Sequence, residues 1–135
     1  MTNYFNFNEL IESEKAESLG IKNIPNWEQI ESLKALVDNV LNPLREALGR
    51  PIYINSGFRT QKLNEAVGGA KNSQHVATSL YAAVDLDCKN KIDNKKMYEL
   101  LRTFDIDQCI NEHDFEWIHV SYRLDKKNRN QYLNN

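Results

Sequence analysis

The sequence predicts an α+β fold in which helices pack on a small, mostly antiparallel sheet. Three observations support this prediction. The first half of the chain has apolar residues at helical spacing, and the second half has short segments rich in Ile, Val, Trp and Tyr, interrupted by one helical pattern. The chain has 135 residues, of which 41% are apolar and 27% charged. We therefore expect one domain over residues 1–135, with a single core.

The N-terminal half is expected to be helical. A short apolar pattern covers residues 7–20 and ends at a glycine. A longer pattern covers residues 26–49, with an asparagine cap at its start and Trp27 on its apolar face. Because Pro43 lies inside this pattern, we expect a kink or a break near residues 41–42.

The C-terminal half is expected to form the sheet. Apolar and β-branched runs bounded by turn residues predict four strands, at residues 51–55, 82–88, 106–111 and 115–122. Helical patterns between them predict two helices, at residues 60–67 and 95–104. The last two strands are close enough in sequence for a tight turn near His113.

Charge and composition exclude several classes of protein. The formal net charge of −2, from 17 Lys+Arg and 19 Asp+Glu, gives no basic field for nucleic acid. The basic tail at residues 123–135 is expected to be solvated and frayed. Cys88 and Cys109 fit no zinc-finger spacing and are expected to be buried free thiols. Without a secretory signal or an apolar run of about 20 residues, we expect a cytoplasmically synthesised chain with no membrane span.

Two residues near the end of the chain are candidates for catalysis. Glu116 precedes His119 by three positions in a segment that otherwise predicts a strand. A strand histidine is more often structural, but a carboxylate beside a metal-bound imidazole can serve as general base. Strict alternation would place these side chains on opposite faces. If both face one site, Glu116 lies in a bulge or at an irregular strand start.

Asp85 and His75 are candidates for metal binding. Asp85 is flanked by aliphatic residues in a core-like strand, where an unpaired carboxylate is costly. Its partner is either a salt bridge, for instance to Arg59, or a cation. His75 lies in a polar loop, where histidine is usually solvated. Together with His119, these residues make two imidazoles and one carboxylate, a ligand set that catalytic zinc uses. If His75 lies out of reach, His113 and Asp87 are the alternatives.

Five segments carry a resemblance to a known family: Ser56-Gly57-Phe58-Arg59, Leu63-Asn64-Glu65-Ala66-Val67-Gly68-Gly69, Ser73-Gln74-His75, Ala83-Val84-Asp85 and Glu116-Trp117-Ile118-His119-Val120-Ser121-Tyr122. In order and spacing they resemble the zinc D-alanyl-D-alanine carboxypeptidase family of peptidoglycan peptidases. The resemblance is to the small single-domain branch of phages and prophages, and it covers about residues 7–122. The fold that it implies is the one shared with Hedgehog signalling domains.

The resemblance also implies roles for individual residues. It implies a zinc ion held by three ligands: His75, Asp85 and His119. Glu116 would be the catalytic base. Arg59 would stabilise the tetrahedral oxyanion or hold the substrate, and Ser73 would help to position the peptide.

The sequence departs from the family pattern between two of these ligands. His75 and Asp85 are ten positions apart, three more than the pattern has, and Tyr81 occupies the position of a glycine. We expect residues 76–80 to protrude as a flexible flap anchored mainly by the metal, and residues 76–81 to be less ordered than the rest of the domain without zinc.

The predicted function is a zinc metallopeptidase that hydrolyses a peptide bond in bacterial cell-wall peptidoglycan, as a D-Ala-D-Ala carboxypeptidase or an endolysin-type endopeptidase. The expected partner is the peptidoglycan stem peptide, and the chain is expected to be a monomer. It would act on the wall after release or as part of a phage particle. The alternative is a non-catalytic zinc-binding, virion structural or wall-binding module of the same fold. The longer loop favours this alternative, whereas Glu116 and Arg59 favour the enzyme.

Overall fold

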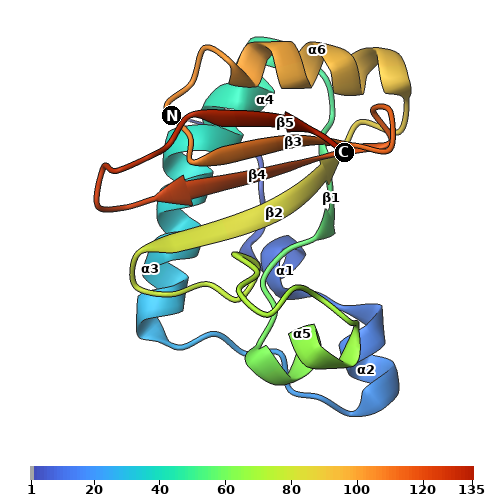
Figure 1. The fold of residues 1–135 in the computed structure, drawn as a ribbon, viewed down its shortest axis with the longest axis vertical. Helices are drawn as coiled ribbons and strands as arrows, with labels where there is room; N and C mark the ends of the chain where they lie inside the picture. The colour runs from blue at the N-terminus through green and yellow to red at the C-terminus, as the bar shows by residue number, and fades with distance from the viewer. Residues whose placement is uncertain (1) are drawn as a thin grey trace.

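A five-stranded, mostly antiparallel sheet with helices packed against it confirms the predicted α+β class (Figure 1). The computed structural model describes residues 2–135. The strands are β1 (Tyr53–Ser56), β2 (Tyr81–Asp87), β3 (Gln108–Glu112), β4 (Trp117–Arg123) and β5 (Gln131–Asn134). Their order in the sheet is β1-β2-β4-β3-β5. Within residues 2–135, every pairing is antiparallel except that of β3 with β5.

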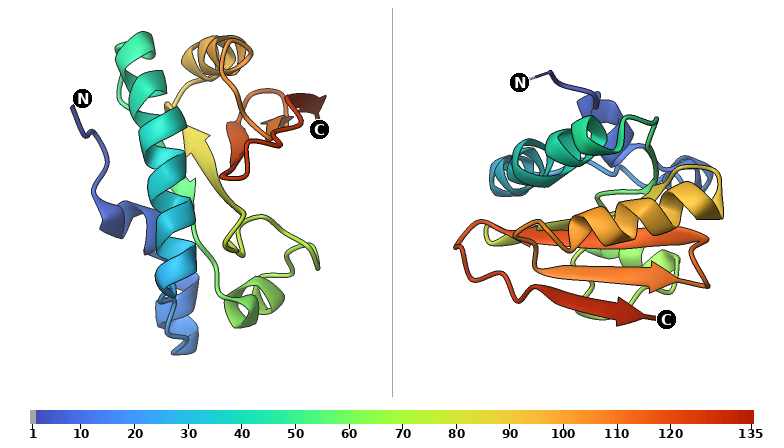
Figure 2. Two further views of the ribbon diagram at one scale, coloured as in Figure 1. Left: turned by 90° about the vertical axis from the view of Figure 1, so that its left-hand side faces the viewer. Right: turned by 90° about the horizontal axis from the view of Figure 1, so that it is seen from above.

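The helices precede and interrupt the strands, as expected. They are α1 (Phe7–Ile11), α2 (Glu14–Leu19), α3 (Trp27–Leu36), the π-helical segment η1 (Val37–Leu41), α4 (Asn42–Leu48), α5 (Gln61–Ala66) and α6 (Lys91–Leu101). Helix α3, η1 and α4 join into one long rod that lies against the sheet (Figure 2). Helix α6 packs beside α4 and contacts β3 and β4. It begins four residues earlier than predicted because Asn90 caps it through Asp93 N–H.

The two faces of the sheet differ in chemistry. Side chains on alternate positions of β2, β4 and β3 are buried in the core beneath the helices: Ala82, Val84, Leu86, Ile118, Val120, Tyr122 and Cys109. The intervening positions carry Asp85 on β2 and His119 on β4, which are half-buried. This alternation separates an apolar face that packs on the helices from a polar face that can carry a site.

The predicted helical pattern at residues 7–20 is divided in the structure. Glu12 has an extended conformation between α1 and α2. The Ser13 hydroxyl then accepts a hydrogen bond from the Ala16 N–H and caps α2. Gly20 ends α2 with a left-handed φ of 67°, so the predicted glycine stop is confirmed.

The expected disruption by proline takes the form of a π-helical turn. Pro43 has no N–H to donate to the helix ladder. The chain places η1 immediately before it, and the Asn42 N–H donates to the Val37 carbonyl, five residues back. The extra residue in this turn accommodates the proline, and the rod continues into α4.

The prediction that Trp27 belongs to the apolar face of this helix is wrong. Its side chain is 81% exposed, whereas Leu33 and Leu36 on the same helix are fully buried. Trp27 precedes Leu36 by nine residues, which at about 100° per residue places it on the opposite side of the helix. It also lies in the first turn, next to the Asn26 cap.

The prediction of a frayed tail at residues 123–135 is also wrong. Residues 131–134 form β5 alongside β3, and the tail that precedes them is tied down by Asp107. The carboxylate of Asp107, 0% exposed, accepts two hydrogen bonds from the Arg129 guanidinium, at 3.0 and 2.8 Å. The basic residues of the tail therefore include a partner for a buried acid, which composition alone does not reveal.

Because of the ion pair between Asp107 and Arg129, we expect the stability of the fold to depend on pH in the acidic range. Burial alone would raise the pKa of Asp107, but hydrogen bonds from Arg129 and Gln74 outweigh it and lower the pKa. A carboxylate with a lowered folded-state pKa stabilises the fold above its unfolded pKa of about 3.9, and this contribution is lost as the pH falls. We expect the unfolding free energy to fall more steeply between about pH 5 and 2 in the wild type than in Asp107→Asn, as measured by urea titration. Parallel pH profiles would contradict this assignment.

The two cysteines are buried and unbonded, as predicted. Burial raises the pKa of the Cys88 thiol to about 11 and that of Cys109 to about 12. Because the thiolate is the reactive form, we expect neither thiol to react with a thiol reagent in the native protein at pH 8. Both should react after denaturation without reductant. Titration of fewer than two thiols in the denatured chain would contradict the prediction.

Over residues 2–135, no helix combines the length and the apolar character needed to cross a bilayer.

Candidate metal centre

Three side chains from distant parts of the sequence meet on the polar face of the sheet. They are His75 from the loop between α5 and β2, Asp85 from β2 and His119 from β4. One potential ligand atom of each lies within 4.8 Å of the others. The two imidazole rings are 5.2 Å apart, centroid to centroid. His75, Asp85 and His119 therefore lie together as predicted. The cluster does not include the alternatives His113 and Asp87.

The sheet register explains why Asp85 and His119 meet. They are directly opposite each other in the antiparallel pair β2 and β4, so both side chains project from the same face. Nδ1 of His119 lies 3.0 Å from Oδ1 of Asp85. The salt bridge to Arg59 that the sequence left open as a partner for Asp85 is thus replaced by contacts with two histidines.

His75 is held from behind by the backbone. It is 5% exposed, and its Nδ1 lies 2.8 Å from the carbonyl oxygen of Gly57. A carbonyl only accepts, so the proton of the neutral ring is on Nδ1 and the lone pair is on Nε2. Nε2 lies 3.3 Å from Oδ1 of Asp85 and points toward the cluster. A carbonyl bound to the far nitrogen is the usual support for a metal-binding histidine.

Electrostatics at the cluster favour an ionised carboxylate. Burial alone would raise the pKa of Asp85, but its contacts with His119 and His75 outweigh burial and hold the pKa well below the ordinary carboxyl range. Two imidazoles and an anionic carboxylate are donors that suit Zn²⁺ and leave a further coordination position for water. The residues present therefore fit a catalytic zinc ion.

The prediction that residues 76–80 protrude as a flap is wrong, whereas the predicted effect of zinc on the order of residues 76–81 stays a prediction. The Ala77 side chain is 2% exposed and belongs to the core. The Ala77 carbonyl accepts a hydrogen bond from Gln29 Nε2 at 2.9 Å, and the Thr78 carbonyl accepts one from the Ser32 hydroxyl. Leu80 accepts one from the Leu124 N–H at 2.8 Å. The extra residues are thus anchored to α3 and to the end of β4 by contacts that need no metal.

Gly57, whose carbonyl contacts His75, lies in a place where the backbone has no room for a side chain. A Cβ atom there would lie 2.1 Å from the Leu10 carbonyl oxygen and 2.8 Å from its carbon. The neighbouring Phe58 N–H donates to the same oxygen at 2.7 Å. Helix α1 therefore approaches β1 so closely that only glycine fits.

Gly57→Ala is expected to weaken both the fold and the site. Overpacking against the backbone should lower the unfolding free energy by about 1–3 kcal/mol. Because the Gly57 carbonyl supports His75, zinc affinity should also fall about 10–100-fold. Urea unfolding and zinc titration against a chelator measure the two effects separately. Unchanged zinc affinity in a folded variant would show that this carbonyl does not position His75.

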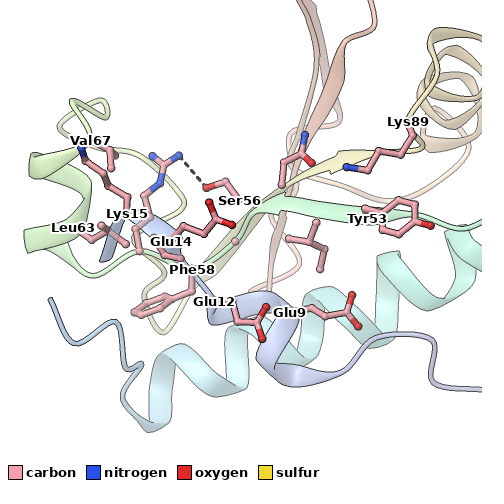
Figure 3. A pocket seen from close by; sticks show the side chains of 15 residues that line it. Glu9, Glu12, Glu14, Lys15, Tyr53, Ser56, Phe58, Leu63, Val67 and Lys89 are labelled. Carbon is pink, nitrogen blue, oxygen red and sulfur yellow. Dashed lines mark hydrogen bonds between the residues drawn. The ribbon is translucent and has the colours of Figure 1, made fainter. Parts of the chain in front are cut away.

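Arg59 lies beside the cluster but faces another cavity. Its guanidinium donates to Asn64 Oδ1 and Ser56 Oγ, each at 3.1 Å. It lines a cavity of about 660 Å³ between α1, α2, β1 and α5, where Glu9 and Glu12 also lie (Figure 3). Burial lowers the pKa of Arg59, and the charge of Asp85 opposes that change, which indicates that the two groups are near each other. Its predicted contact with substrate at the zinc position stays a prediction.

Ser73 lies where a substrate-positioning residue was predicted. It lines the cavity of about 670 Å³ that contains His75, Asp85 and His119. Its hydroxyl also accepts a hydrogen bond from the His75 N–H at 3.2 Å, so it helps to shape the loop.

Glu116 lies in the turn immediately before β4. The sequence predicted such an irregular strand start if Glu116 and His119 face one site. It is the last residue of a turn in which His113, Asp114 and Phe115 have φ values of 50°, 55° and 64°. Asn94 Nδ2 fixes this turn by donating to the Phe115 and Glu116 carbonyls at 2.9 and 3.1 Å. The Glu116 side chain is exposed and is not among the residues that line the cavity at the histidines.

Several residues of this cavity were not identified from the sequence. They include Glu112, Trp117, Gln74, Tyr81, Arg123 and Arg129. Strand alternation would have identified some of them. Trp117 and Arg123 are two and four positions from His119 along β4, so their side chains lie on the same face as that of His119. Gln74 and Arg129 could not be found in this way, because they lie in loops.

Comparison with known proteins identifies one family. The family model described as Peptidase M15 matches residues 3–121, which include all three residues of the cluster. No curated protein matches the chain.

Proposed function

The chain belongs to the Peptidase M15 family, and from this premise we propose that it is a zinc metallopeptidase that hydrolyses a peptide bond in bacterial cell-wall peptidoglycan. The observation that carries the proposal is the convergence of His75, Asp85 and His119, with ligand atoms within 4.8 Å of one another. They lie in a cavity large enough for a peptide segment. A structural metal site would not need such an opening.

Each residue of the centre would have a distinct task. His75, Asp85 and His119 would hold the zinc ion, and the Gly57 carbonyl would keep Nε2 of His75 directed at it. When bound there, zinc supplies a Lewis acid that polarises the scissile carbonyl and lowers the pKa of water.

Glu116 would accept a proton from the attacking water and return it to the leaving amine. Ser73 would position the peptide beside His75. Arg59 would stabilise negative charge that develops near the cluster.

A second candidate function is a non-catalytic zinc-binding or wall-binding module. The exposed side chain of Glu116, outside the lining of the cavity, favours this alternative. The intact ligand set and the opening at the cavity favour the peptidase.

The experiment that tests the proposal is digestion of purified peptidoglycan by the zinc-loaded protein. We expect new amino groups and shortened stem peptides, identified by mass spectrometry, and loss of both after chelation. Restoration by zinc would assign the activity to the centre. A protein that binds one zinc ion and the wall but releases no product would support the non-catalytic module instead.

Action on the wall also requires delivery. We propose that the protein reaches its substrate after cell lysis or as part of a phage particle. Immunodetection in purified particles and in lysates distinguishes these two routes.

A further inference from the structure

Two arginines stand at one end of the cavity that contains the His-Asp-His cluster. Arg123 is the last residue of β4, and Arg129 lies in the loop between β4 and β5. Both line the cavity together with His75, Asp85 and His119. Arg123 is four residues beyond His119 and faces the same side, which corresponds to about 13 Å between their Cα atoms at about 3.3 Å per residue.

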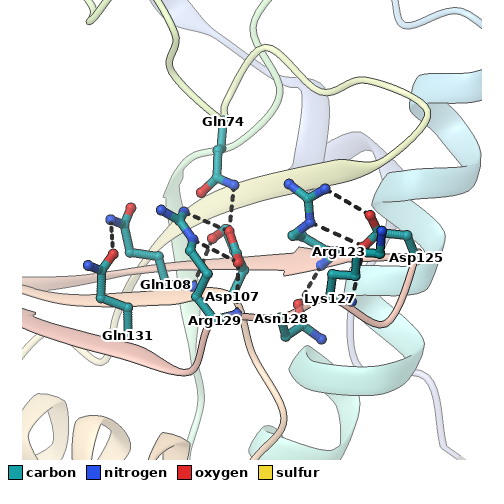
Figure 4. Close-up of polar contacts among 10 residues, drawn as sticks. Gln74, Asp107, Gln108, Arg123, Asp125, Lys127, Asn128, Arg129 and Gln131 are labelled. Atoms are coloured by element: carbon teal, nitrogen blue, oxygen red, sulfur yellow. Dashed lines mark hydrogen bonds and ion pairs between the residues drawn. The ribbon is translucent and has the colours of Figure 1, made fainter.

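Both guanidinium groups are held in place by carboxylates (Figure 4). Arg129 donates from Nε and Nη2 to the two oxygens of the buried Asp107. Arg123 donates in the same way to Asp125, at 3.1 and 2.8 Å. These contacts use one edge of each guanidinium. Within residues 2–135, Nη1 of Arg123 and Nη1 of Arg129 make no hydrogen bond with the protein.

The two positive charges also lie close to each other. The pKa of Arg129 is raised, chiefly by its hydrogen bond to Asp107, and the charge of Arg123 opposes this change. Each guanidinium is already paired with one carboxylate, and the remaining Nη1 N–H groups are donors with the planar geometry that suits a second carboxylate.

The opposite end of the cavity has a different character. Glu112 and Trp117, which are paired across β3 and β4, line that end. The two ends of the cavity therefore differ: guanidinium N–H donors lie at one end, an acid and an aromatic ring lie at the other, and the metal ligands lie between them. Such a difference orients a charged peptide in one direction.

We propose that Arg123 and Arg129 form a carboxylate-binding subsite that holds an acidic group of the peptide substrate away from the scissile bond. An extended peptide covers about 13 Å in about four residues, and the length of the arginine side chain shortens this span, so the acidic group lies about two to four residues from the bond that is cut. This inference rests on the proposed peptidase function, because it names the substrate of the same cavity.

The test compares two synthetic stem peptides, L-Ala-γ-D-Glu-L-Lys-D-Ala-D-Ala and the same peptide with the glutamate α-carboxylate replaced by a carboxamide. Affinity is measured by calorimetry on the full chain without metal, and KM on the zinc-loaded protein. We expect the wild type to bind the acidic peptide about tenfold more tightly, which is about 1.4 kcal/mol.

The variants are chosen to remove one charge each. Arg123→Gln should lose most of the preference for the acidic peptide, with little change for the amide. Lys127→Gln is the matched control, because Lys127 is an exposed cation in the same segment that does not line the cavity. It should keep the wild-type preference. Arg129 is left unchanged because it also holds Asp107.

The outcomes separate this inference from the proposed function. Equal affinity for the two peptides, no binding of either, or an unchanged preference in Arg123→Gln would overturn the subsite. Binding with the expected preference but no hydrolysis by the zinc-loaded protein would support the subsite and count against the peptidase activity.

Discussion

Glu116→Ala is expected to reduce peptidoglycan hydrolysis about 10²–10⁴-fold while zinc remains bound, the loss typical of removing a general base. Zinc should remain because Glu116 does not belong to the cluster of His75, Asp85 and His119. The measurement pairs metal content with the rate of amino-group release under the same conditions. Full activity in this variant would exclude Glu116 as the base.

Glu112 is the comparison that the structure makes necessary. Its side chain lines the cavity at the cluster, whereas that of Glu116 does not. We expect Glu112→Ala to reduce the rate much less than Glu116→Ala, because the exposed Glu116 side chain is free to turn toward a bound substrate. Apo structures often show catalytic contacts that form only with substrate. If the order is reversed, Glu112 is the base. Glu99→Ala, which changes an exposed acid on α6, controls for loss of charge alone.

Asp85→Asn is expected to weaken zinc binding strongly and to reduce the activity with it. The amide keeps the shape of the side chain but removes the negative charge that balances the metal, so we expect zinc affinity to fall at least about 100-fold, the upper end of the losses seen for outer-shell partners. The fold should survive, since the amide oxygen still accepts a hydrogen bond from one histidine.

Thermal unfolding with and without zinc measures this effect independently of activity. A metal that binds only the native state stabilises it in proportion to its affinity, so zinc should raise the Tm of the wild type and not that of Asp85→Asn. Asp87→Asn is the matched control on the same strand; its side chain accepts hydrogen bonds from Lys89 and Asn94 and is not in the cluster. An equal zinc-induced rise in Asp85→Asn and the wild type would remove Asp85 from the ligand set.

Much of the secondary structure could be predicted because its signals are local. The Asn26 cap, the Gly20 stop and the alternation around Asp85 depend on residues a few positions apart. The proline signal at Pro43 was also local, but its outcome was not. Whether the helix breaks or inserts a π-helical turn depends on the packing of the rod against the sheet.

Two of the errors have a common cause, which is that they concern contacts between distant segments. The tail was expected to fray because its composition is basic, yet Arg129 pairs with Asp107 across 22 positions of sequence. The longer loop was expected to depend on metal, yet Gln29 and Ser32 of α3 hold it. Periodicity and propensity contain no information about such pairings.

The sequence by itself predicted the fold class, and it offered His75, Asp85 and His119 as metal-ligating candidates, with His113 and Asp87 as alternatives. Residue type suggested these candidates, and the family resemblance of segments such as Glu-Trp-Ile-His implied the ligand set. Only the tertiary structure decided that these candidates meet: the β2–β4 register sets Asp85 opposite His119, and the Gly57 carbonyl directs His75 toward both. The tertiary structure also decided which arginines face the cavity, placing Arg123 and Arg129 there and Arg59 in another one. The physical reason is that side-chain direction in a loop follows from what the loop packs against, and that is settled only when the whole chain is folded.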